Sequence, residues 1–137
     1  MIGPEKLGLD TNVLLRYLTQ DDPTQSPKAT ELIEQHLTKE NPGFVNLVCV
    51  LEIVWVLGSL YKRSRGETAD HIETILAADT LEVQNEQEVY QAVVALRNAA
   101  GSFGDALIGA LGGWWGCSAT LTFDEDAAKR LNGFQLV

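Results

Sequence analysis

The chain has 137 residues, the size of one compact domain that can bury a hydrophobic core without disulfide bonds. Its formal net charge of −9 argues against a surface devoted to nucleic acid, because phosphate binding normally leaves a basic footprint. Apolar residues make up 45% of the sequence, which is ordinary for a globular protein. We therefore expect residues 1–137 to form a single domain.

The first residues have neither the basic region nor the apolar run of a signal peptide. The most apolar stretch, residues 47–57, is too short to span a bilayer and contains Glu52. The sequence thus predicts a cytoplasmic protein with no membrane segment. Cys49 and Cys117 lie in apolar segments without metal-type spacing, which predicts two buried free thiols.

Strands and helices alternate along the chain. In the first part Ser26 is expected to cap a helix that begins at Pro27. Asn85 is expected to cap a later helix. Apolar runs predict strands over residues 6–9, 44–46, 81–84, 117–123 and 134–137. Helical periodicity predicts helices over residues 12–18, 27–37, 47–61, 67–78, 86–99, 105–114 and 124–131. This alternation indicates an α/β fold around a parallel sheet, whose ligands gather at the carboxyl ends of the strands.

Three acids follow predicted strands or open predicted helices, and each has an ordinary structural explanation. Asp10 ends the first strand and would cap the next helix. Asp105 would favour a helix dipole. Asp124 follows the strand "TLTF", where Thr122 and Glu125 fit a capping box. Alone, none of these positions requires a catalytic role.

Glu52 is harder to explain structurally, since it is the only charge between Leu47 and Tyr61. Its neighbours at helical spacing are apolar, and burying an unpaired carboxylate costs several kcal/mol. Either a distant arginine pairs with it or a cation lies beside it. Together with the acids at the sheet edge, Glu52 predicts a carboxylate cluster, which repels itself unless divalent cations fill it. Oxygen ligands without His or Cys favour Mg²⁺ or Mn²⁺, the metals of phosphoryl transfer.

Four segments in order, "LDTNVLLRYL", "LEIVWVL", "GDALIGAL" and "GCSATLTFDEDAAKR", resemble the successive motifs of PIN-domain ribonucleases. More closely, they are similar to the VapC toxins of type II toxin–antitoxin pairs. The resemblance implies a three-layer α/β/α fold with a central parallel sheet of four to five strands. It also implies an endoribonuclease dependent on Mg²⁺ or Mn²⁺ that cleaves RNA, often tRNA or ribosomal RNA. Its partners would be a cognate antitoxin and a second copy in a homodimer.

The resemblance assigns the metal and the chemistry to the four matching acids, Asp10, Glu52, Asp105 and Asp124. Thr11, Asn12 and Thr122 match polar companions that would orient the carboxylates or the water. Asp126 is either an outer acid or a plain helix-start charge. Arg16 would pair with a site acid or meet RNA phosphate, unless it is an ordinary surface residue. At the end of the third helix, Lys62, Arg63 and Arg65 are candidates for binding the RNA backbone, although a solvated helix end is the more common explanation of such a cluster.

Two alternatives remain open from the sequence. One is a metal-dependent nuclease or phosphohydrolase outside toxin–antitoxin biology, acting on DNA flaps or small phosphate esters. The other is an inactive PIN fold that serves as an interaction module, against which the presence of all four acids argues.

Overall fold

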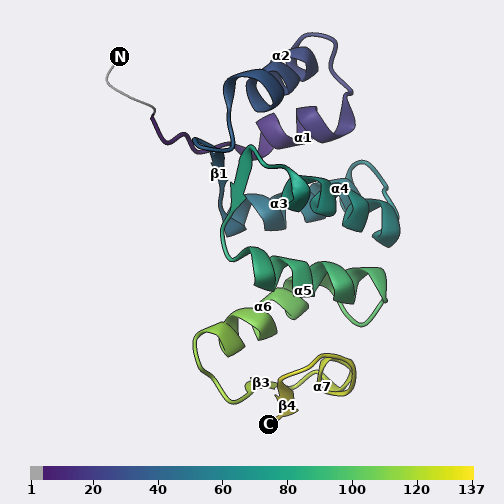
Figure 1. Cartoon of the computed structure of the whole chain (residues 1–137). Helices are drawn as coiled ribbons and strands as arrows, with labels where there is room; N and C mark the ends of the chain where they lie inside the picture. The colour runs from purple at the N-terminus through teal and green to yellow at the C-terminus, as the bar shows by residue number, and fades with distance from the viewer. Residues whose placement is uncertain (1–4) are drawn as a thin grey trace.

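Helices make up most of the chain in the computed structural model, which describes residues 5–137 (Figure 1). The helices are α1 (Thr11–Thr19), α2 (Gln25–Glu31), the π-helical turn η1 (Leu32–His36), α3 (Leu47–Ser59), α4 (Arg65–Ala77), α5 (Glu86–Arg97), α6 (Phe103–Trp114) and α7 (Glu125–Arg130). The strands are β1 (Gly43–Val45), β2 (Leu81–Val83), β3 (Thr120–Thr122) and β4 (Phe134–Leu136). The predicted alternation of strands and helices is thus present.

The first sheet contains β1 and β2, which pair in parallel with Phe44 opposite Glu82. The expected strand over residues 6–9 is reduced to one parallel bridge between Gly8 and Phe44. Two backbone hydrogen bonds hold this segment, from the N–H of Leu9 to the C=O of Phe44 (2.9 Å) and from the N–H of Phe44 to the C=O of Leu7 (2.8 Å). It therefore lies along β1 and ends at Asp10.

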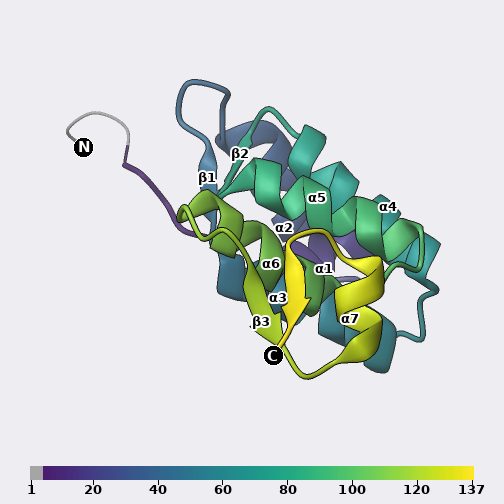
Figure 2. The same cartoon turned by 90° about the horizontal axis from the view of Figure 1, so that it is seen from below.

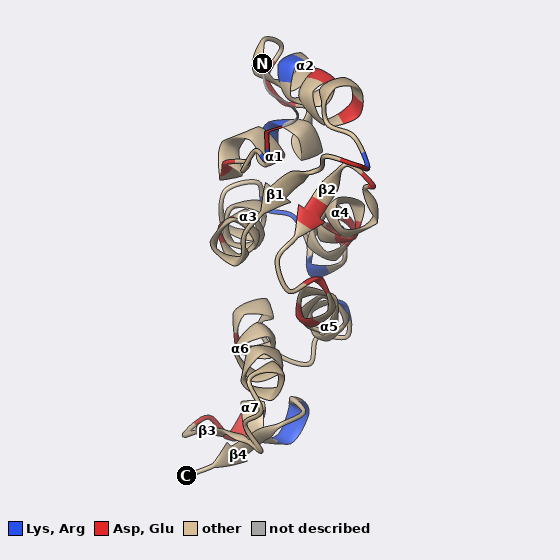
Figure 3. Cartoon of the chain, turned by 60° about the vertical axis from the view of Figure 1, so that its left-hand side comes forward, with Lys and Arg blue, Asp and Glu red and all other residues tan. Residues whose placement is uncertain are grey.

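The second sheet contains only β3 and β4, also parallel, and it does not pair with the first within residues 5–137. The expectation of one central sheet of four to five strands between two helical layers is therefore not met. Figures 1 and 3 both show α5 and α6 between the two sheets, with β3, β4 and α7 at the end of the molecule opposite α2. We call residues 120–137 the C-terminal unit.

The strands of the C-terminal unit lie beside α6 (Figure 2), where glycines of the helix face them. A Cβ atom added at Gly109 would lie 2.5 Å from the ring of Phe134, and one at Gly112 would lie 2.8 Å from Oγ1 of Thr120. The absence of side chains at these two positions lets the sheet approach the helix. The packing of α6 therefore determines where the second sheet lies.

The core lies between α1, α3, α4 and α5 and extends along α6. Its largest fully buried side chains are Leu14, Ile33, Val45, Val50, Ile53, Leu57, Ile72, Ile75, Val89, Val93 and Leu107. All of them except Val45, which lies in β1, belong to helices and form the inward faces of those helices. Removing this apolar surface from water is the main favourable contribution to folding.

Several helix starts have the expected chemistry. Asn46 accepts a hydrogen bond from the N–H of Cys49 at the start of α3. Ser64 and Glu67 form a reciprocal capping box at the start of α4. Ser26 is not the cap that the sequence predicted. The helix α2 starts at Gln25, so Ser26 lies inside it and is buried. The carboxylate of Asp22 instead accepts the N–H groups of Thr24 and Gln25 at the start of this helix.

Two further expectations concern buried thiols and membrane segments. Cys49 is buried as predicted, whereas Cys117 is exposed in the loop after α6, so the prediction of a second buried thiol is wrong. That loop follows two glycines and two exposed tryptophans and does not enter the core. Within residues 5–137, each helix is too short or too polar to cross a bilayer.

Candidate functional site

The centre of the candidate site is a chain of contacts from Asp10 through Thr11 to Glu52. Asp10 is the N-cap of α1, and its Oδ1 atom accepts the N–H of Thr11 at 2.8 Å. The buried Thr11 hydroxyl donates to Oε1 of Glu52, also at 2.8 Å. The structural role and the site position of Asp10 are therefore compatible, because capping engages only one of its two oxygens in a hydrogen bond.

A surface hollow between α1 and α3 contains both carboxylates. Arg16 and Tyr61 also line it, and Asn12 is exposed beside Asp10. The full lining is Asp10, Thr11, Asn12, Leu15, Arg16, Glu52, Val56, Leu60 and Tyr61. The structure therefore brings together two of the four predicted acids and both of their N-terminal polar companions.

Glu52 is exposed, which corrects the expectation that it is buried in an apolar helix. Its neighbours Val48 and Trp55 are also exposed, at 66% and 63% of their surface. The apolar sequence of α3 therefore reflects a helix with two apolar faces, of which one packs in the core and the other surrounds Glu52. Because Glu52 is exposed, the free-energy cost of burying an unpaired carboxylate is not the reason to expect a cation beside it.

Asp105 and Asp124 do not line this hollow. Asp105 is half-buried in the first turn of α6, where its N–H donates to Oγ of Ser102. Asp124 is the exposed N-cap of α7 and belongs to the C-terminal unit. Among residues 5–137, no three Asp, Glu, His or Cys side chains lie close enough together to hold a metal ion.

The companions of Asp124 serve the start of α7. The carboxylate accepts the N–H of Asp126 at 2.9 Å and that of Ala127 at 3.2 Å. The Thr122 hydroxyl oxygen accepts the N–H of Asp124 at 3.0 Å. Asp124 itself is therefore the cap, and Thr122 with Glu125 is not the capping box that the spacing suggested.

Arg16 faces the hollow but pairs with neither site acid. Its guanidinium donates to Asp21 (3.2 Å), to the Tyr61 hydroxyl (3.2 Å) and to Gln25 (2.9 Å). The Tyr61 hydroxyl in turn donates to Asp21 at 2.6 Å. These contacts hold the arginine side chain against the wall of the hollow, so that Asp10 and Glu52 keep their negative charge unpaired by it.

The three basic residues after α3 differ in the exposure and the hydrogen bonding of their side chains. Lys62 is exposed and has a left-handed backbone, with φ of 55°. Arg63 is half-buried and lies 6.0 Å from the ring centre of Tyr61. Arg65 donates to the backbone carbonyls of Leu96 and Gly101, which ties the start of α4 to the α5–α6 connection. Of the three, Lys62 is the exposed cation whose side chain forms no hydrogen bond or ion pair within residues 5–137.

Lys28 is a cation near the site that the sequence did not single out. With Arg16 and Asn12 it lines a second hollow, between α1 and α2, next to the first. Lys28 follows a proline in an ordinary helical segment, and only the packing of α2 on α1 brings it near Asn12. Lys and Arg are otherwise spread along the whole length of the chain (Figure 3).

The site fits a hard divalent cation in its donor set. Asp10, Glu52 and Thr11 offer only oxygen, and neither acid forms an ion pair with a lysine or arginine of residues 5–137. Mg²⁺ commonly keeps several waters and binds through one or two carboxylates together with substrate phosphates. Two carboxylates in one open hollow satisfy that requirement.

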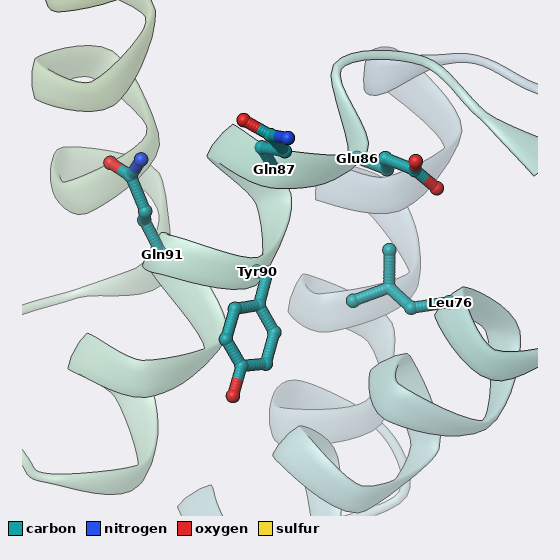
Figure 4. Close-up of a pocket in the computed structure, with 5 residues that line it drawn as sticks. All are labelled: Leu76, Glu86, Gln87, Tyr90 and Gln91. Atoms are coloured by element: carbon teal, nitrogen blue, oxygen red, sulfur yellow. The ribbon is translucent and has the colours of Figure 1, made fainter.

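Another hollow, between α4 and α5, lacks such chemistry. Leu76, Glu86, Gln87, Tyr90 and Gln91 line it, and Figure 4 shows Leu76 on one helix and the other four side chains on the neighbouring helix. It has one carboxylate, no cation and none of the predicted site residues. The hollow at Asp10 and Glu52 is therefore the better candidate.

Two comparisons bear on the identity of the chain. A comparison with curated proteins gives no match. The family described as PIN domain matches residues 8–132, which contain every predicted site residue and nearly the whole chain. The chain therefore belongs to the PIN domain family, whose members are generally nucleases.

Proposed function

We propose that the protein is an endoribonuclease toxin of the VapC type, dependent on Mg²⁺ or Mn²⁺, with RNA such as tRNA or ribosomal RNA as its substrate. One observation carries this proposal: in a PIN domain, Asp10 and Glu52 line one open hollow and are linked through Thr11. Two unpaired carboxylates in one hollow suit a cation better than a structural role. We expect such an enzyme to act in the cytoplasm, where its substrates are.

The residues that line the hollow would have different roles in cleavage. Asp10 and Glu52 would hold the cation, and the Thr11 hydroxyl fixes the orientation of Glu52 through its 2.8 Å hydrogen bond. A bound divalent cation supplies a nucleophilic water at neutral pH and stabilises charge on the phosphate. Asn12, exposed beside Asp10, is suited to orient that water or the phosphate.

The acids outside the hollow are part of the same proposal. Asp105 and Asp124 would supply the remaining carboxylates, with Asp126 as an outer acid. Thr122 would support Asp124 through the 3.0 Å contact to its N–H group. For these residues the support is their match to the family motifs, and they must approach Asp10 for the proposal to hold.

Basic side chains next to the hollow would bind the RNA backbone despite the net charge of −9. Arg16 and Lys28 line the adjoining hollow, and Lys62 is exposed beyond Tyr61. Local cations can attract phosphate within a globally acidic protein. Arg63 is half-buried, and the guanidinium of Arg65 is held by backbone carbonyls, so we expect smaller effects from these two.

The proposed antitoxin would bind to the same negatively charged side chains, Asp10 and Glu52. A basic segment would be attracted to the acidic hollow, and an arginine entering between Asp10 and Glu52 would take the place of the cation. The exposed Val48 and Trp55 beside Glu52 offer apolar surface to such a segment. Binding would then block the site rather than distort the fold.

The test is cleavage of total RNA by the purified protein with Mg²⁺, Mn²⁺ or a chelator. We expect cleavage only with metal, and its loss in Asp10→Asn and Glu52→Gln. Asp79→Asn, at an exposed acid between α4 and β2, is the matched control and should cleave normally. Co-expression with the product of the neighbouring gene should suppress cleavage in the unaltered protein.

Two results would count against the proposal. Cleavage that survives the chelator, or equal cleavage by Asp10→Asn, would remove the metal site. Cleavage of DNA flaps in place of RNA would favour a different nuclease of the same fold. Calorimetric titration with Mn²⁺ gives a readout without RNA, in which Asp10→Asn should bind more weakly than Asp79→Asn.

A further inference from the structure

The segment Leu7–Leu9 has an unpaired edge beside the candidate site. Its hydrogen bonds to β1 use the N–H of Leu9 and the C=O of Leu7. The N–H and C=O of Gly8 therefore point to the opposite side, where they have no backbone partner within residues 5–137. An open edge of this kind is a template for a further strand.

The C-terminal unit has a second unpaired edge, along β3. Within the described residues, β4 is the neighbour of β3 on one side and nothing pairs on the other. The N–H of Thr120 and the C=O of Thr122 are directed at the β4 side. The peptide groups of Leu121 therefore face outward.

One face of the β3–β4 sheet is uncovered. Thr120 lies opposite Phe134 in the register, and this face packs on Gly109 and Gly112 of α6. Side chains alternate along a strand, so the next residues form the other face. Its apolar members are exposed at 64%, 86% and 74% of their surface: Leu121, Phe123 and Val137.

A second apolar surface lies on α3, which is joined to the segment Leu7–Leu9 by the hydrogen bond from Sγ of Cys49 to the C=O of Leu9 (3.4 Å). Helix α3 starts directly after β1 and presents an outward row one helical turn apart. The row consists of Val48, Leu51 and Trp55, exposed at 66%, 39% and 63%. A single chain thus exposes two strand edges and two apolar faces. Hydrophobic residues that are scattered singly over a surface need no explanation, but contiguous exposed apolar faces mark interaction sites.

We propose that two copies of the chain assemble reciprocally, with β3 of each copy pairing in parallel with Leu7–Leu9 of the other. The uncovered face of the C-terminal unit would then lie on the α3 row of the second copy. In a parallel pair the outward N–H and C=O of Leu121 would bond to the C=O of Lys6 and the N–H of Gly8, which sets Leu121 opposite Leu7. Asp124, just beyond β3, then comes opposite Asp10, just beyond Leu9. This extension rests on the proposed function for the role of Asp124: each site is completed by the partner copy.

The strand β3 of a second copy is better placed to pair with Leu7–Leu9 than β3 of the same chain. Within the chain, Phe134 packs on Gly109 and Leu131 packs on Gly101, which holds the C-terminal unit on the far side of α5 and α6 (Figures 1 and 3). Only five residues, 115–119, connect α6 to β3. Two reciprocal contacts related by a two-fold axis close the assembly and leave no open edge.

The first test is the mass in solution by light scattering. We expect twice the chain mass of 15.0 kDa, and a shift to single-chain mass in Phe123→Asp. Val94→Asp, on the exposed side of α5, is the matched control and should remain a dimer. A protein that is a single chain at all concentrations would overturn the proposal.

The second test locates the contact without using activity. One preparation carries Gly8→Cys and another carries Leu121→Cys, both with Cys117→Ser to remove the exposed native thiol. A side chain at Gly8 meets nothing within 4 Å in the single chain. After refolding together, a short bis-maleimide should link the two chains, whereas neither preparation alone should be linked. A third preparation carries both substitutions in one chain. Cross-links confined to single chains of this preparation would show that β3 pairs with Leu7–Leu9 of its own chain, which would overturn the proposal.

The third test is complementation between inactive variants. Asp10→Asn and Asp124→Asn should each lose cleavage, and refolding them together should restore about a quarter of the normal activity, since half of the dimers would contain one intact site. A cross-linked dimer without restored activity would overturn the shared site. If the unaltered protein cleaves no RNA, the proposed function fails, while the mass and cross-linking still decide the assembly.

Discussion

Asp21 is the most strongly hydrogen-bonded carboxylate near the candidate site. It accepts hydrogen bonds from the hydroxyls of Tyr61 (2.6 Å) and Thr19 (2.8 Å), and pairs with Arg16. These contacts, that of Tyr61 first, lower the pKa of Asp21 below its ordinary value. A carboxyl whose pKa is lower in the folded state stabilises the fold above its ordinary pKa, and this stabilisation is lost as the pH falls through the lowered value.

Tyr61→Phe should therefore raise the pKa of Asp21 toward its ordinary value, because the largest cause of the shift is removed. NMR titration of the side-chain carboxyl carbons measures this directly. Tyr17→Phe is the matched control, since the Tyr17 hydroxyl donates to Glu34 and not to Asp21. An unchanged Asp21 titration in Tyr61→Phe would mean that the other contacts determine the charge state of Asp21.

Single residues of the site were predictable where the signal is local. Asp10 ends an extended segment and starts a helix, and both roles are present in "LGLDTN". The Thr11–Glu52 hydrogen bond joins residues 41 positions apart and has no local signal. Of the roles expected for Arg16, pairing with a site acid is not present, because Asp21 and Tyr61 bind its guanidinium, while contact with RNA stays a prediction.

At the scale of elements, the glycines of α6 make the approach of the C-terminal unit testable. Gly109→Ala should destabilise the fold because its Cβ would lie 2.5 Å from the ring of Phe134. Gly113→Ala in the same helix meets nothing within 4 Å and should instead gain about 0.5–1 kcal/mol of helix stability. Urea unfolding of the two variants compares them directly. Equal stabilisation by both would show that Phe134 does not pack on α6.

Helix positions were largely predictable from the sequence, because apolar periodicity and capping are local. Residues 47–61 were predicted as a helix that the structure ends at Ser59, and the helix predicted over residues 12–18 spans Thr11–Thr19. Strand pairing was less predictable. Strands of three residues contain little periodic signal, and their partners depend on how α5 and α6 pack between them.

At the scale of the whole molecule, the net charge of −9 should weaken the fold at low ionic strength. Acidic residues repel one another, and salt shortens the range of this repulsion to about 10 Å at 0.1 M. We expect the urea midpoint to rise as NaCl is added. The same rise with KCl would identify screening, whereas a difference between the two salts would point to bound ions. A midpoint that falls with either salt would contradict the expectation.

The double use of Asp10 has an evolutionary consequence. Asparagine caps helices about as well as aspartate, so one nucleotide change at this codon removes the negative charge while α1 keeps its start. Loss of the proposed cleavage therefore need not involve loss of folding. Lineages freed from selection for activity would accumulate stable, inactive copies that still occupy an antitoxin and, in the reciprocal dimer, impair the active copies they join.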